Sequence, residues 1–325
     1  MISSDDLVHL AYTADLTDAG ILYARRVLRH LPASTSAGLY GTLRRCVAAT
    51  AAQLAFRRFL VAEGIPFSVS PPPFTDPDRY DLELGIGRCE LKAFLISHPS
   101  QIAALESNPA VVLSAPALVP VERHAAETPQ GGQFYMFAFV SGTVSQGGVP
   151  RALAERKGLF CMHAMPLLWR RPKTWAPLGE LFISSKSARP IRIELAGEDR
   201  SGEYAQLSVD IPPGHRMSVS ADMYSLSHVC ISGPQTDIIQ IRASARRLVH
   251  AISPGDWHDI SVQGREISLL GWMRRELFRS KARLIHAGSR VYQFDRTRAE
   301  NLAVDVAQLY PVRTLLEAAR EAARQ

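Results

Sequence analysis

Cysteine is scarce in this sequence, and its few copies are never close together. The four cysteines are Cys46, Cys89, Cys161 and Cys230, and no Cys-x-x-Cys pair occurs. This spacing argues against a zinc knuckle or an iron–sulfur cluster, whose ligands include closely spaced thiols. Isolated cysteines are typical of small core residues with reduced thiols. We therefore expect a cytoplasmic protein.

Long hydrophobic runs are also missing. No stretch approaches the roughly 18 apolar residues that are needed to cross a membrane. The longest runs, such as residues 134–140, have the length of a buried strand. The chain opens with Met-Ile-Ser-Ser-Asp-Asp, which is acidic, whereas a secretory signal starts with positive charge and continues into an apolar segment. We expect neither export nor a membrane partner.

Several well-known catalytic motifs do not occur. The sequence has no G-x-x-x-x-G-K-[ST] and no G-x-G-x-x-G, which argues against a nucleotide motor or a dinucleotide enzyme. It also has no G-x-S-x-G nucleophile elbow. The 10 histidines are scattered, with no H-E-x-x-H, so a zinc hydrolase is not expected.

Lysine is the rare basic residue of this chain. Only five of the 37 basic residues are lysines, so a lysine inside a motif is more informative than an arginine. The net charge of +6 is compatible with a polyanionic partner but does not require one. The 325 residues, 46% hydrophobic and 21% charged, predict an ordinary globular protein of two domains at roughly 100–200 residues each.

The first part of the chain alternates between helical and strand-like patterns. Residues 1–32 have helical spacing, and a longer helix follows Ser36 and ends at Gly64. A further helix is expected near residues 99–105. The expected strands cover residues 65–70, 80–84, 88–96 and 134–140. The predicted order is therefore helix, strand, hairpin of two strands, helix and strand.

The second part has a different pattern. Residues 141–150 are rich in glycine and serine and are our preferred domain boundary. Short alternating runs separated by turns fill residues 178–270, which predicts an antiparallel sandwich or barrel. Residues 299–325 return to a helical pattern. We therefore predict two domains, at residues 1–145 and 146–325.

The predicted hairpin carries the clearest chemical pattern. Successive side chains of a strand point to opposite faces. Asp81 and Glu83 therefore share a face of the first strand, and Glu90 and Lys92 share a face of the second. With Ile86 at the tip, Asp81 is expected opposite about Lys92. The hairpin then gathers carboxylates and a lysine on one surface.

Such a cluster suits the hydrolysis of a phosphodiester bond. Two carboxylates can hold Mg²⁺, a hard cation that prefers oxygen ligands and keeps several waters. The ion can lower the pKa of a bound water and offset the charge that builds on the phosphate. A nearby lysine can position the water or neutralise the transition state. We expect Mg²⁺, or Mn²⁺, as the cofactor.

The pattern Asp-x8-Glu-x-Lys on a hairpin, between helix–strand and helix–strand segments, resembles the PD-(D/E)xK nuclease superfamily. The resemblance covers residues 36–141 and implies a restriction-endonuclease-like core. It implies metal ligation by Asp81, Glu90 and the backbone carbonyl of Leu91, with Lys92 as the catalytic lysine. Members often place a Glu or Gln on the preceding helix, and Gln53 matches that position best.

Some alternatives remain open at this site. Pro77-Asp78 is a literal Pro-Asp pair, so Asp78 is a rival of Asp81 as the first acidic ligand. An E-x-K pattern by itself also occurs by chance, and it can be an exposed ion pair on a hairpin face, which contributes little to stability. A nuclease-like fold that has lost its chemistry is a further reading.

Two basic segments are candidates for contact with nucleic acid. One carries Arg170, Arg171 and Lys173 between two tryptophans, and the other carries Arg274 and Arg275 after Trp272. Cations interleaved with aromatic rings can follow a phosphate backbone and stack on bases. The alternative for both segments is a structural one, with core tryptophans and a solvated basic face.

The sequence as a whole predicts an α+β or α/β protein. The resemblance implies a restriction-endonuclease-like core, and the later pattern predicts a β-rich sandwich or barrel-like domain that ends in helices. The expected activity is metal-dependent hydrolysis of DNA, with RNA as a possible substrate. The alternative is a non-catalytic protein that binds nucleic acid or a partner. The β-rich half is a candidate for forming a homo-oligomer or binding a protein partner.

Overall fold

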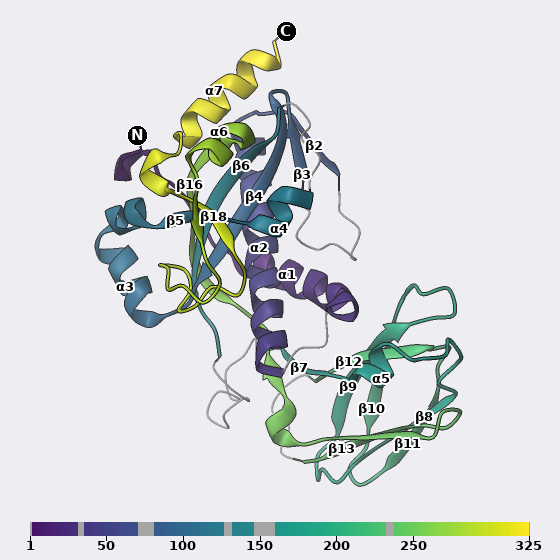
Figure 1. Cartoon of the computed structure of the whole chain (residues 1–325). Helices are drawn as coiled ribbons and strands as arrows, with labels where there is room; N and C mark the ends of the chain where they lie inside the picture. The colour runs from purple at the N-terminus through teal and green to yellow at the C-terminus, as the bar shows by residue number, and fades with distance from the viewer. Residues whose placement is uncertain are drawn as a thin grey trace. The chain divides into compact units, whose positions relative to one another are not determined.

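The computed structural model describes residues 2–31, 36–70, 81–126, 132–145, 160–231 and 237–324. The chain forms two compact units of mixed α and β structure (Figure 1). Unit 1 consists of Met1–Gly20, Arg45–Thr143 and Val262–Gln325, and unit 2 consists of Ile21–Arg44 and Val144–Ser261.

This division differs from the expected split after residue 145. The segment Val262–Gln325 belongs to unit 1, because its strand β16 (Gln263–Arg274) pairs with β6 (Phe134–Thr143) and with β1 (Val8–Ala11). The segment Ile21–Arg44 belongs to unit 2. A boundary read from local composition misses both segments, because the pairing partners lie far apart in the chain.

Unit 1 is built on a six-stranded mixed sheet. Its strands, in sheet order, are β1, β16, β6, β4 (Gly87–Ile96), β3 (Asp81–Leu84) and β2 (Phe67–Ser70). Strands β4 and β6 are parallel, and every other neighbouring pair is antiparallel. Parallel neighbours need a crossover connection, and the chain between β4 and β6 supplies it with helix α3 (Pro99–Ser107).

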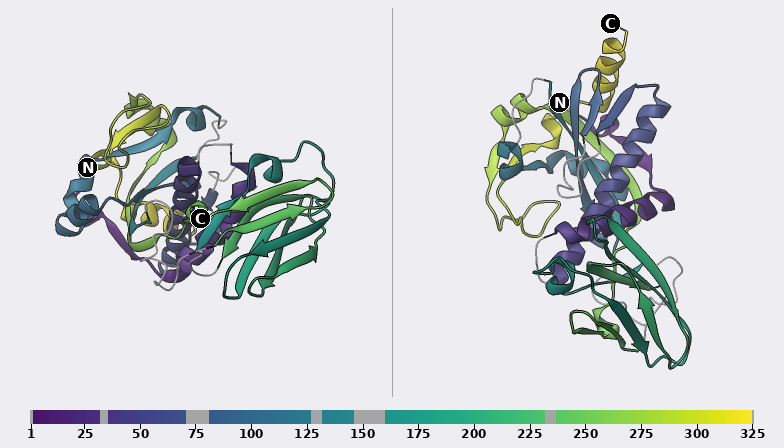
Figure 2. Two further views of the ribbon diagram at one scale, coloured as in Figure 1. Left: turned by 90° about the horizontal axis from the view of Figure 1, so that it is seen from below. Right: turned by 90° about the vertical axis from the view of Figure 1, so that its right-hand side faces the viewer.

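The two faces of this sheet are covered by different elements. Helix α2 (Ser36–Ala62) and helix α7 (Val312–Ala322) share a core with one face. Helix α3, helix α6 (Arg275–Lys281) and a small sheet cover the other face (Figure 2, right). The strands of the small sheet, in order, are β17 (Arg283–Ile285), β18 (Asn301–Asp305) and β5 (Pro116–Pro120). Helix α4 (Val121–Ala126) follows β5 directly.

Helix α2 confirms the helix that was expected after Ser36. Small apolar residues such as Ala48, Ala51 and Ala55 recur at helical spacing and are buried against the sheet. Gly64 ends the helix with a φ of 66°, a left-handed conformation that glycine adopts without strain. The amide of Ile65 then donates to the carbonyl of Leu60 and closes the last turn.

Unit 2 contains two antiparallel sheets that share one hydrophobic core. The first sheet has the order β10 (Tyr204–Ile211), β9 (Ile191–Glu198), β12 (Ser225–Ile231), β7 (Cys161–Ala164) and β15 (His258–Asp259). The second has the order β11 (Arg216–Ser220), β8 (Glu180–Ser185), β13 (Ile239–Ala243) and β14 (Leu248–Ile252). Helix α1 (Ala14–Val27), the short helix η2 (Leu28–His30) and helix α5 (Leu167–Arg170) contribute further residues.

Both ends of the chain contain strands where helices were expected. Residues 8–11 form the edge strand β1 instead of a helix, and residues 301–305 form β18 before the predicted helix α7. Each segment is too short for its periodicity to distinguish the two forms, and each pairs with a distant strand. Within the described residues, no helix is long and apolar enough to cross a membrane.

Buried histidines make the stability of unit 2 sensitive to acid. Burial, together with nearby Arg25, holds the pKa of His228 well below its ordinary 6.5. Burial is also the main cause that lowers the pKa of His163, His250 and His258. The unfolded chain therefore binds protons first as the pH falls. The stability that these neutral imidazoles contribute is full above pH 6.5 and is lost as the pH falls below it.

We expect unit 2 to lose stability between pH 7 and pH 5. A single buried imidazole contributes up to about 1.4 kcal/mol per pH unit below its unfolded-state pKa. Hydrogen exchange of peptides from β9 and β12 in urea, measured at several pH values, checks this prediction. An unfolding midpoint that stays constant over this pH range would contradict it.

Candidate functional site

The candidate site begins at the β3–β4 hairpin. Gly85 and Ile86 form the turn, and Leu84 pairs with Gly87. This two-residue turn sets the register so that Asp81 pairs with Glu90. The expected pairing of Asp81 with about Lys92 is therefore wrong by two residues. The turn contains only Gly85 and Ile86, whereas the expected pairing needs a turn centred later in the chain. A shift of two residues leaves every position on its expected face.

Gly87 fixes how the hairpin lies against the neighbouring chain. Its φ is 130°, and a Cβ atom at this position would lie 1.8 Å from the carbonyl oxygen of Gly132. Only glycine fits such a close approach of two backbones. The start of β4 is thus held beside the start of β6, where its parallel pairing begins with Cys89 and Phe134.

Glu90 and Lys92 form a buried ion pair on one face of β4. Their side chains are only 9% and 11% exposed, and the Lys92 ammonium contacts the Glu90 carboxylate. Cys89 and Leu91 point to the opposite face and belong to the core under α2. The alternation predicted for this strand is confirmed. The alternative of an exposed ion pair on a hairpin face therefore does not describe Glu90 and Lys92.

The described part of the hairpin reaches this pair. The described ladder between β3 and β4 stops at Asp81 and Glu90, whereas β4 continues beside β6 to Ile96. Leu91 is therefore the first residue of β4 past the last described pair. Asp78, the rival first ligand, lies outside the described residues.

A polar network that the sequence did not reveal adjoins the pair. The Lys92 ammonium lies 5.7 Å from the ring centroid of Tyr135, and the Tyr135 hydroxyl forms a 2.9 Å hydrogen bond with His124 Nδ1. Arg275 donates to the backbone carbonyl of His124 and, at 2.6 Å, to the side-chain oxygen of Gln133. Strands β4 and β6 and helices α4 and α6 thus meet at one place.

The imidazole of His124 is neutral at neutral pH. Burial is the largest cause that lowers its pKa, and the positive charges of Arg275, Arg279 and Lys92 lower it further, against the opposing effect of Glu90. Tyr135 looked like one more apolar residue of a buried strand. The pairing of Tyr135 with Glu90 in the parallel ladder indicates that Tyr135 lies beside the ion pair. This pairing is known only once the strand register is known.

Gln53 lies on the helix that covers the other face of the sheet. Its neighbours Ala52 and Phe56 pack in the core with Leu91, whereas Glu90 points away from that core. The side-chain oxygen of Gln53 is buried and accepts no hydrogen bond from the described residues. The structure does not bring Gln53 together with Glu90 and Lys92, and its catalytic role stays a prediction.

The donor set at the hairpin is compatible with a hard divalent cation. Among the described side chains, no group of three or more His, Cys, Asp or Glu residues could hold a metal ion. Mg²⁺ needs fewer, because it is commonly bound through one or two carboxylates and keeps several waters. Asp81 and Glu90 are register partners in the β3–β4 ladder, and Leu91 follows the last described pair. These residues fit Mg²⁺.

The basic residues proposed to contact nucleic acid have different environments. Lys173 and Arg274 are exposed. Arg171 donates to the carbonyls of Arg29 and Leu31 at 3.0 and 3.1 Å, and so holds the end of η2. Arg170 and Arg275 are each only 6% exposed, which removes them from the outer surface. Contact of these residues with nucleic acid stays a prediction.

No model of a known protein family matches this sequence, and no curated protein matches it either.

Proposed function

We propose that the protein is a metal-dependent nuclease that hydrolyses phosphodiester bonds of DNA, with RNA as the second candidate substrate. The observation that carries the proposal is the buried pair of Glu90 and Lys92 at the end of the described β3–β4 ladder, with Asp81 in register with Glu90. A buried ion pair contributes little net stability compared with apolar residues of the same size. A chemical role accounts for charges at this position.

The order of elements around the pair supports a restriction-endonuclease-like core. Helix α2 precedes β2, β3 and β4, and helix α3 leads into β6, which lies parallel to β4. Helices α2 and α3 pack on opposite faces of the sheet. This order supports the proposed core, in which β3 carries Asp81 and β4 carries Glu90 and Lys92.

In this proposal the carboxylates of Asp81 and Glu90 and the carbonyl of Leu91 would hold Mg²⁺ or Mn²⁺. When bound there, the ion would supply a water of lowered pKa and offset charge on the phosphate. Lys92, whose ammonium contacts the Glu90 carboxylate, would stabilise the negative charge of the transition state. The Tyr135 ring lies beside the Lys92 ammonium, and the hydrogen bond from Tyr135 to His124 fixes the position of that ring.

The second candidate is a non-catalytic protein with a nuclease-like fold. The ion pair of Glu90 and Lys92 favours this candidate, because the two side chains neutralise each other's charge and need no metal ion. Such a protein would bind nucleic acid or a protein partner through the two-sheet unit.

Incubation with plasmid and single-stranded DNA distinguishes the two candidates. We expect cutting with Mg²⁺ or Mn²⁺ and none with EDTA. Binding of DNA without any metal-dependent cutting would favour the second candidate instead. Parallel reactions with RNA identify the nucleic acid that is cleaved.

A further inference from the structure

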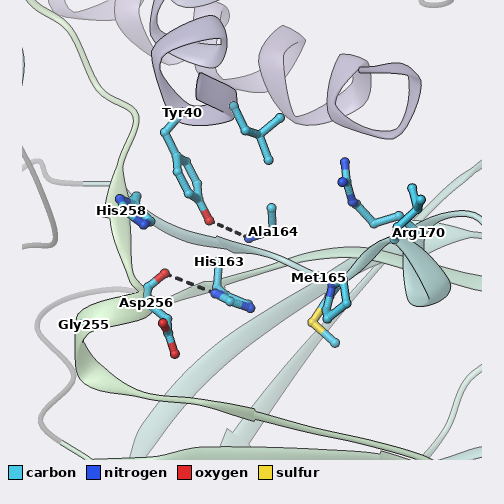
Figure 3. A pocket seen from close by; sticks show the side chains of 11 residues that line it. Tyr40, His163, Ala164, Met165, Arg170, Gly255, Asp256 and His258 are labelled. Atoms are coloured by element: carbon cyan, nitrogen blue, oxygen red, sulfur yellow. Dashed lines mark hydrogen bonds between the residues drawn. The ribbon is translucent and has the colours of Figure 1, made fainter. Parts of the chain in front are cut away.

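Unit 2 contains a cavity of about 430 Å³ that the proposed nuclease chemistry does not use. It is bounded by the first turns of α2, by the segment from β7 to α5, and by the segment from the short helix η4 (Pro254–Asp256) to β15 (Figure 3). Its volume lies within the roughly 300–1,000 Å³ of small-molecule sites. All of its lining residues belong to unit 2.

One wall of the cavity is aromatic and rigidly held. The rings of Tyr40 and His258 stack with their centroids 3.8 Å apart. The amide of Ala164 donates to the Tyr40 hydroxyl at 2.9 Å (Figure 3). Burial raises the pKa of Tyr40 to about 12, so the phenol stays neutral. Tyr40 is thus a fixed surface for a ligand to pack on.

The floor of the cavity is a histidine whose tautomer is set by its partners. His163 Nδ1 lies 3.1 Å from the carbonyl of Asp256 and must donate to it, because a carbonyl only accepts. Nε2 of the neutral ring then accepts from His250, whose Nε2 is 2.9 Å away. The two rings also stack. Both ring nitrogens of His163 therefore have hydrogen-bond partners within the protein, so His163 lines the cavity without needing a ligand.

Arg170 is different, because its charge has no acidic counterpart among the described residues. It lines the cavity and is only 6% exposed. Its Nη1 reaches the carbonyl of Leu28 at 3.5 Å, the limit of a hydrogen bond, and its Nε has no partner. Within the described part of the chain it forms no ion pair. A guanidinium that is buried without an anion is costly, so this position favours an anionic ligand.

Asp256 adds an acidic residue to the lining of the cavity. In Figure 3 its side chain and that of Arg170 lie at opposite sides, with His163 and Met165 between them. One Asp256 carboxylate oxygen accepts from the amide of Ser253 at 2.8 Å. The other oxygen is available to accept from a hydroxyl group of a ligand.

We propose that this cavity binds a small polyhydroxylated anion, whose carboxylate or phosphate pairs with Arg170 and whose hydroxyl donates to Asp256. A guanidinium fits both kinds of anion through paired N–H donors. The apolar side of the ligand packs on Tyr40 and Met165. This site lies in unit 2 and does not depend on the nuclease proposal.

Binding of ribose 5-phosphate, gluconate and uncharged ribose by the whole protein tests the site, with calorimetry as the readout. Ribose 5-phosphate and gluconate distinguish a phosphate from a carboxylate. We expect one of the two anions to bind at millimolar concentration or below, and ribose to bind at least ten times more weakly. If neither anion binds wild-type protein at about 10 mM, ten times the expected millimolar concentration, the proposal is overturned.

Two variants separate a binding role of Arg170 from a structural one. Arg170→Met should fold as well as wild type, because no ion pair is lost, and should bind the anion at least tenfold more weakly. Lys173→Met removes the same charge from an exposed position nearby and should bind like wild type. If Arg170→Met binds the anion with wild-type affinity, or if Lys173→Met loses as much affinity as Arg170→Met, the assignment is wrong.

Discussion

Replacing Lys92 by glutamine should lower the rate of metal-dependent DNA cleavage at least about 100-fold, the usual cost of losing one stabilising group at a transition state. Lys92 is the one lysine of the hairpin and contacts Glu90 directly. Glutamine removes the positive charge but keeps an N–H donor that can face the Glu90 carboxylate. Rates on plasmid DNA with Mg²⁺ measure the effect.

A matched control makes this result specific. Lys186 is an exposed lysine of unit 2, and Lys186→Gln should cut at the wild-type rate. Hydrogen exchange of β6 in both variants checks that unit 1 is folded. A folded Lys92→Gln variant that cuts as fast as wild type would exclude Lys92 from the chemistry.

Breaking the Glu90–Lys92 pair from one side should destabilise unit 1 by about 3–5 kcal/mol. The remaining charge would be buried among the aromatic residues of β6, with side-chain exposures near those of the present pair, 9% and 11%. Lys92→Met and Glu90→Leu are the single variants. The double variant Glu90→Leu/Lys92→Met should recover most of the loss, because it leaves no unpaired charge.

Urea unfolding followed by hydrogen exchange of β4 and β6 peptides measures these free energies for unit 1 alone. This choice matters because a chain with two units does not unfold in a single two-state step. Single variants that each cost less than about 1 kcal/mol would mean that water screens the pair, as it does for surface ion pairs.

Local patterns predicted the elements near the candidate site well. The long helix α2, the hairpin of β3 and β4 and the apolar strand β6 each carry their periodicity within a few residues. The shared face of Glu90 and Lys92 follows from strand alternation alone. These features depend on the nearest neighbours in the chain, which the sequence displays directly.

Features that depend on distant pairing could not be predicted in the same way. Strand β16 joins the sheet of unit 1, although its alternating pattern matches that of the strands in unit 2. The contact between Tyr135 and His124 arises only when α4 lies over β6. The sequence predicts Arg170 and Arg275 as surface cations, because no pattern in the neighbouring residues indicates that a long basic side chain is buried.

The central claim is that Asp81, Glu90 and Leu91 hold one divalent cation beside Lys92. Crystals of the protein grown with Mn²⁺ test it most directly, through anomalous scattering from the ion. The account predicts one Mn²⁺ bound by the carboxylates of Asp81 and Glu90 and the carbonyl of Leu91, at about the 2.1 Å that separates Mg²⁺ from its oxygen ligands. Glu90 still paired with Lys92 in crystals saturated with Mn²⁺, with no ion at the hairpin, would contradict it.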